Sequence, residues 1–128
     1  MNLKDVLKPK SKEEIINLMD SLSAIDLLLK SSEAGFLPGI KKALKLGADI
    51  HYGQDEALRW ASGNGHKEIV ELLLKNGANI HDYKDEALRL ASYNGHKEIV
   101  ELLLKYGANI HNIKNIRFNN WLHIMVGP

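Results

Sequence analysis

A thirty-residue segment that is repeated almost unchanged constrains the fold of this chain more than any other feature. Residues 54–83 recur as residues 84–113, and only six of the thirty columns differ between the two copies. A period of this length is typical of proteins built as a stack of small units, each too short to bury its own apolar face. We therefore expect an elongated binding scaffold, and the pattern argues against an enclosed catalytic pocket.

A third, more divergent copy precedes the two similar ones. Shifting the sequence by thirty residues aligns Gly35 with Gly65 and Gly47 with Gly77. Apolar residues between these glycines also align, which places the divergent copy in phase with the others. The predicted units are residues 24–53, 54–83 and 84–113.

Each unit is predicted to contain two short helices joined by a turn. In the third unit, residues 85–92 are predicted to form the first helix, and the acidic residues at its start suit the positive end of the helix dipole. Gly95 can supply the left-handed conformation that the turn needs. Residues 97–105 follow as a second helix, whose broad apolar surface must pack on both neighbouring units. Residues 108–111 then form an extended step into the next unit.

The two ends depart from the repeat pattern, because each end of a stack exposes a face that inner units cover. Residues 1–23 contain a capping box that begins at Ser11, followed by one apolar face, and this predicts an N-terminal capping helix. Residues 114–128 carry an apolar stripe that starts at Phe118 and predicts a C-terminal capping segment. The initiating Met and the two caps lead us to expect a complete chain.

The composition argues against several classes of function. The 17 basic and 16 acidic residues are spread along the chain, so the basic stripe of a nucleic-acid-binding surface is missing. The absence of cysteine excludes disulfides and thiolate metal sites. The apolar runs are too short to span a bilayer, and the start lacks the apolar core of a signal peptide. We expect a cytoplasmic protein, or one in a host cytoplasm, that binds neither membranes nor nucleic acids.

The repeated sequence resembles the ankyrin repeat. Leu58 matches the leucine of the family's Thr-Pro-Leu-His start, Gly65-His66 matches its inter-helix turn, and Gly77-Ala78-Asn79-Ile80 matches its ending. The same residues recur thirty positions later, and the resemblance covers about residues 24–113. It implies an all-α ankyrin-repeat solenoid of stacked helix-turn-helix units with helical caps.

Two departures from the family pattern stand out. The units have thirty residues, where about thirty-three is usual. Glu-Ala-Leu-Arg, at Glu56–Arg59 and Glu86–Arg89, stands in place of Thr-Pro-Leu-His. We therefore expect the β-hairpin between units to be shortened to a tight turn. This shortened style resembles the ankyrin arrays of large DNA viruses and some microbial parasites.

Histidines and carboxylates are the residues most able to carry chemistry. The histidines spaced by fifteen residues are His51, His66, His81, His96 and His111. Metal binding is one interpretation, but the spacing places them on alternating turns and linkers without further ligands. By resemblance, His66 and His96 hydrogen-bond the backbone at the turn. The Asp-Glu pairs repeat once per unit, as dipole compensation predicts and a single catalytic centre does not. We expect no enzyme activity, metal or cofactor.

The columns that differ between near-identical units indicate where a partner could bind. By resemblance, the linker turns and the end of the first helix line the concave surface, where aromatic side chains provide large contact areas. The predicted partner-binding residues are Tyr52, Gln54, Tyr83, Lys84, Asp85, Arg89 and Tyr93. Trp60 and Leu90 stay apolar and are expected to belong to the core between units. Drift after a duplication would leave the same differences.

The predicted function is that of a non-enzymatic module that binds another protein through its concave surface. With no catalytic domain it would act by occupying that partner, as an inhibitor, an adaptor or a viral or microbial interference protein, and we expect a monomer. One alternative is a structural, self-associating role through Phe118, Trp121 and Met125. A small-ligand-binding protein is the other alternative, although no pocket signature is found.

Overall fold

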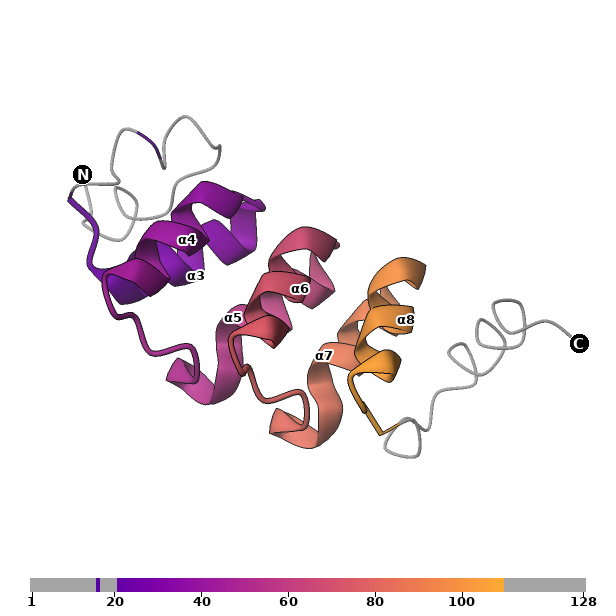
Figure 1. Ribbon diagram of the computed structural model, residues 1–128. Helices are drawn as coiled ribbons and strands as arrows, with labels where there is room; N and C mark the ends of the chain where they lie inside the picture. The colour runs from indigo at the N-terminus through magenta and orange to yellow at the C-terminus, as the bar shows by residue number, and fades with distance from the viewer. Residues whose placement is uncertain (1–15, 17–20, 110–128) are drawn as a thin grey trace, which may run out of the picture.

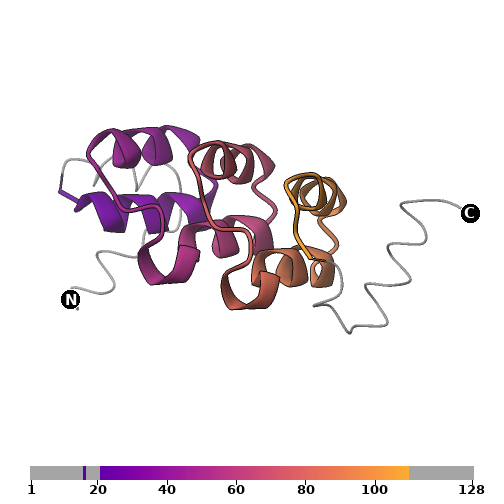
Figure 2. The same cartoon turned by 60° about the horizontal axis from the view of Figure 1, so that its bottom comes forward.

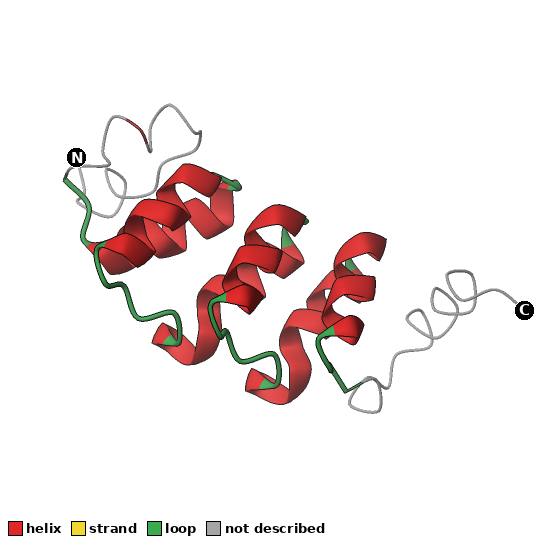
Figure 3. Cartoon of the chain, viewed as in Figure 1, coloured by secondary structure: helices red, strands yellow, loops and turns green. Residues whose placement is uncertain are grey.

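Six helices and their connections make up the part of the chain that the computed structural model describes, Ile16 and residues 21–109. The helices are α3 (Ala24–Ala34), α4 (Leu37–Lys45), α5 (Tyr52–Gly63), α6 (Lys67–Lys75), α7 (Asp82–Tyr93) and α8 (Lys97–Lys105). This part contains no strand, which confirms the predicted all-α class (Figure 3). Apart from Ile16 and residues 21–23, the predicted caps lie outside it, as does the stripe of Phe118, Trp121 and Met125.

The helices form three pairs that stand side by side (Figure 1). Turning the molecule separates two layers, one containing α3, α5 and α7 and the other containing α4, α6 and α8 (Figure 2). Successive first helices pack directly on one another, α3 on α5 and α5 on α7. Because each unit alone has only two short helices, these contacts between units supply much of the core.

The core lies between the two layers and is mainly aliphatic. Its largest fully buried side chains are Leu27, Leu28, Ile40, Leu58, Ile69, Val70, Leu73, Leu88, Ile99 and Leu103. Small residues on the first helices, among them Ala61 and Ala91, are also fully buried. A small side chain at these positions lets neighbouring helices approach closely, whereas the long side chains of the second helices fill the space between layers.

The turn within each unit depends on a glycine. Gly65 and Gly95 have φ values of +84° and +77°, a region that costs other residues about 1–2 kcal/mol. The predicted role of Gly95 is therefore confirmed. The second helix of the third unit spans Lys97–Lys105, the range that its apolar pattern predicts.

The ranges of α5 and α7 both begin with a left-handed turn, which connects one unit to the next and which the sequence did not predict; the regular helix follows it. Gly53, Gln54 and Asp55 have φ values of 64°, 59° and 58°, and Tyr83, Lys84 and Asp85 have values of 53°, 55° and 59°. The expected tight turn in place of a β-hairpin is confirmed, but it consists mainly of residues other than glycine. Three consecutive left-handed residues are costly for L-amino acids, so side chains must stabilise this backbone.

Candidate functional site

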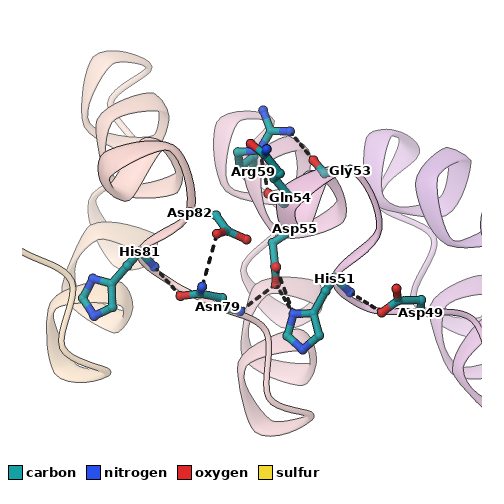
Figure 4. A network of polar contacts seen from close by, with 9 residues as sticks. All are labelled: Asp49, His51, Gly53, Gln54, Asp55, Arg59, Asn79, His81 and Asp82. Atoms are coloured by element: carbon teal, nitrogen blue, oxygen red, sulfur yellow. Dashed lines mark hydrogen bonds and ion pairs between the residues drawn. The ribbon is translucent and has the colours of Figure 1, made fainter.

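Arginine side chains hold the left-handed turns. Arg59 donates from a terminal guanidinium nitrogen to the Gly53 carbonyl at 2.8 Å and from Nε to the Gln54 carbonyl at 3.2 Å (Figure 4). In the next unit Arg89 donates to the Tyr83 carbonyl at 2.9 Å. A planar guanidinium can donate several bonds at once, as these turns require. This pairing explains why arginine ends the Glu-Ala-Leu-Arg motif.

A buried carboxylate ties the second unit to the linker that follows it. Asp55 is 1% exposed and accepts hydrogen bonds from Nδ1 of His51 at 2.9 Å and from the Asn79 amide at 2.6 Å (Figure 4). Asp85 is fully buried in the same way and accepts from Nδ1 of His81 at 2.8 Å. The first acidic residue of each pair is thus a structural acceptor, and compensation of the helix dipole does not account for it.

The asparagine of the linker supports the same connection. The Asn79 side-chain oxygen accepts from the His81 amide at 2.9 Å, as the Asp49 carboxylate does from the His51 amide one unit earlier. Asn79 also donates to the Asp82 carboxylate at 3.2 Å. These short-range bonds fix the linker in one conformation, which aims the Asn79 amide at Asp55.

Two titratable groups in this network are perturbed by the Asp55 carboxylate. The hydrogen bond to Asp55 raises the pKa of His51, because it favours the charged imidazolium. A hydrogen bond to Asp55 also raises the pKa of Asp82, and burial and the Asp55 charge act in the same direction. Asp82 therefore gains a favourable partner when it is protonated and a repulsive one when it is ionised.

The turn histidines link the second and third units to the unit before each of them. Nε2 of His66 donates to the Glu33 carbonyl at 3.0 Å, and Nε2 of His96 donates to the Gly63 carbonyl at 2.9 Å. The predicted hydrogen bond to backbone is confirmed, although we did not foresee that the acceptor belongs to the preceding unit. Across Ile16 and residues 21–109, no group of three or more His, Cys, Asp or Glu side chains is placed to hold a metal ion.

Six of the predicted contact residues lie at the surface, and three of them are tyrosines. Tyr52, Tyr83 and Tyr93 are 48%, 52% and 60% exposed. Gln54, Lys84 and Arg89 are exposed as well. We call these residues the tyrosine patch; its members are Tyr52, Gln54, Tyr83, Lys84, Arg89 and Tyr93. Asp85 was wrongly assigned to a contact surface, because its side chain is buried beneath His81.

A further feature lies between α5 and α7. Trp60 and Leu90 are only partly buried, so the prediction that they belong to the core is wrong. Both line a hollow of about 290 Å³ together with Glu33, Arg59 and Gly63. Apolar residues at this one repeat column in both similar units could have signalled a surface hollow, but they are equally compatible with a core position.

Comparison with known families identifies the chain. A family model described as ankyrin repeats in three copies matches residues 20–114, whereas a search of curated proteins gives no match. No helix in the part of the chain described by the structure is long and apolar enough to cross a membrane. Ankyrin repeats are generally protein–protein interaction modules and are typically non-enzymatic. Since the match covers most of its length, the chain belongs to the ankyrin repeat family.

Proposed function

We propose that this chain binds a partner protein through the tyrosine patch, on the concave side that the first helices and linker turns form. It acts by occupying that partner, as an inhibitor, an adaptor or an interference protein of a virus or microbe. The observation that carries the proposal is the exposure of three tyrosines. About half or more of the surface of Tyr52, Tyr83 and Tyr93 is accessible to solvent. Tyrosines bury large areas on binding at a small cost in conformational entropy.

The backbone at Tyr83 supports a role beyond folding. Its φ of 53° lies in the region that glycine tolerates best, and the preceding unit has Gly53 at the equivalent position. Holding a side chain there costs about 1–2 kcal/mol. Strain of this kind concentrates at functional sites, and here it presents an aromatic ring to solvent.

The test is affinity capture from lysate of the native cell or host, read out by mass spectrometry. The wild-type chain is compared with a Tyr83→Ala/Tyr93→Ala variant whose circular dichroism and urea denaturation show that it is folded. Tyr106→Ala is a matched control, because Tyr106 is 41% exposed but lies at the end of the second helix α8. Partners retained by the control and lost by the double variant support the proposal.

Two outcomes contradict it. Partners that bind the double variant as well as the wild type place the binding surface elsewhere. Absence of any partner, together with a dimer mass in light scattering, favours self-association instead.

A further inference from the structure

The hollow between α5 and α7 is lined by two large apolar side chains from successive units and by four polar residues, Glu33, Arg59, Asn64 and Asn94. The apolar residues are Trp60 of α5 and Leu90 of α7, and Gly63 also lines the hollow. A side chain added at Gly63 would lie 3.4 Å from the Leu90 Cβ, so the glycine leaves space that a larger residue would fill. The third unit has Tyr93 at the position of Gly63, so the repeat pattern does not demand glycine here.

Stacking of the units does not require apolar residues at the positions of Trp60 and Leu90. The column that contains Trp60 and Leu90 has Lys30 in the first unit, where it is also partly buried. A lysine is therefore compatible with this position on a first helix. Two adjacent apolar residues at a partly exposed position that tolerates lysine indicate a contact surface for another molecule.

The two charged residues that line the hollow, Arg59 and Glu33, differ in whether they already have an ion-pair partner. The guanidinium of Arg59 is already engaged, since it donates to two turn carbonyls and pairs with Glu86 at 3.2 Å. Glu33 is exposed and forms no ion pair with any residue of the described part of the chain. The lining therefore offers one carboxylate without an ion pair in the described chain, and it lines the same hollow as the apolar side chains of Trp60 and Leu90. A complementary ligand is apolar where it enters the hollow and basic beside it.

The size of the hollow limits what can occupy it. At about 290 Å³ and open to the surface, it is at or below the lower end of the range for small-molecule sites, about 300–1,000 Å³. One amino-acid side chain is an occupant of suitable size. An extended peptide segment is the simplest carrier of such a side chain, because an extended backbone presents single side chains to surface pockets.

We propose that the hollow receives one aliphatic or aromatic side chain from an extended segment of the partner, with a lysine or arginine of that segment beside Glu33. This inference rests on the proposed function and specifies what the partner presents. According to this proposal, Trp60 and Leu90 bind the apolar side chain of the partner. Neither residue belongs to the tyrosine patch.

The probe is a phage-displayed library of random dodecapeptides, selected on the wild-type chain, with the enriched peptides then synthesised for calorimetry. We expect enriched peptides to share one apolar residue next to a lysine or arginine. Leu90→Lys should weaken their binding about thirtyfold, the effect of losing an interface hot spot. Trp60→Lys is a second variant, at the equivalent position of α5. Both variants introduce the residue that the first unit has at this position.

Reversal of the Glu33 charge gives an independent readout. Selection on Glu33→Lys should enrich aspartate or glutamate beside the apolar anchor in place of the basic residue. Failure to obtain any peptide, or enriched peptides that bind Leu90→Lys and Trp60→Lys as tightly as the wild type, would overturn the assignment of the hollow. If such peptides still lose binding to Tyr83→Ala/Tyr93→Ala, the proposed function stands and only the anchor site is wrong.

Discussion

The guanidinium carbon of Arg59 lies 4.5 Å from the centre of the Tyr83 ring, so a side chain of the second unit stacks on the turn that opens the third. The same guanidinium holds the left-handed turn of its own unit and pairs with Glu86 of the next. One partly buried arginine thus joins two units through a cation–π contact and an ion pair, while two further hydrogen bonds hold the turn of its own unit. It also fixes the orientation of a tyrosine in the proposed binding surface.

Arg59→Lys should lower the free energy of unfolding by about 1–2 kcal/mol. Lysine keeps the charge but cannot reproduce the forked donors or the planar stacking on Tyr83. Urea denaturation measures the loss. Arg89→Lys is the matched control, since Arg89 is 44% exposed where Arg59 is 15% exposed, and its loss should be smaller. Equal losses in the two variants would show that the contacts of Arg59 between units contribute nothing.

Gly65→Ala should destabilise the chain more than Gly95→Ala, although both glycines are left-handed. The backbone strain of about 1–2 kcal/mol is common to both. At Gly65 the new Cβ would also lie 2.7 Å from Cε1 of His96, whereas at Gly95 it meets no atom within 4 Å in the described chain. Displacing the ring breaks the His96 bond to Gly63, an additional cost of about 1–3 kcal/mol.

Thermal or urea unfolding of the two glycine variants provides the comparison. A third variant, Gly65→Ala combined with His96→Ala, should lose less than the sum of its two single substitutions. Strict additivity would mean that the ring and the glycine do not interact.

Asp82→Asn should stabilise the chain increasingly as the pH rises from about 3 to about 7. The pKa of Asp82 is raised in the fold above its usual 3.8, because of its hydrogen bond to Asp55. Its contribution to stability is therefore present below the unfolded value and is lost as the pH rises through the folded value. Asparagine donates the same bond at every pH, and the following unit has Asn112 at this position.

The measurement for Asp82 is the difference in the free energy of unfolding between variant and wild type across that pH range. Taking the difference removes the titration of shared groups that do not interact with Asp82, and leaves that of Asp82 and its partners Asp55 and His51. A gain of about 0.2–1 kcal/mol near neutral pH is expected for relief of one like-charge pair near the surface. A difference that does not change with pH would contradict the hydrogen bond between the two carboxyl groups.

Leu73→Ala should cost about 2–5 kcal/mol, because it empties a fully buried site in the central unit. Helix α6, which carries Leu73, packs on α5 and also contacts α4 and α8, so both neighbouring units should loosen. Urea denaturation monitors the loss, and hydrogen exchange of α4 and α8 amides reports the loosening. A loss below about 1 kcal/mol would show that the core assignment is wrong.

Much of the fold could be predicted from the sequence, because it depends on short-range patterns. The repeat period, the apolar pattern of Lys97–Lys105 and the position of Gly95 are local signals, and all three correspond to what the structure contains. The left-handed turn at Tyr83–Asp85 could not be predicted in this way. Its residues have no intrinsic preference for that conformation, and its stabilising donor, Arg89, comes from the following helix.

The candidate site was only partly predictable for a related reason. The exposure of the three tyrosines could be predicted because their repeat columns vary. Asp85, beside them, was predicted to be exposed because acidic residues are usually found at the surface. Asp85 is buried because His81 and the linker fold over it, which is a tertiary effect. The identity of Asp55 and Asp85 between copies, next to the variable positions 54 and 84, was the one signal of a structural role.

The bonds made by the turn histidines give the stack a direction. The second and third units each donate from a histidine ring nitrogen and an asparagine side-chain amide to a carbonyl of the unit before, as His96 and Asn94 do to Gly63. In the same way, the Gly63 carbonyl and Gly65 of the second unit contact the His96 ring of the third. Head and tail of a unit are thus complementary, so an in-frame duplication of thirty residues recreates both joints unchanged, and arrays of this type can lengthen by copying without redesign of the interface.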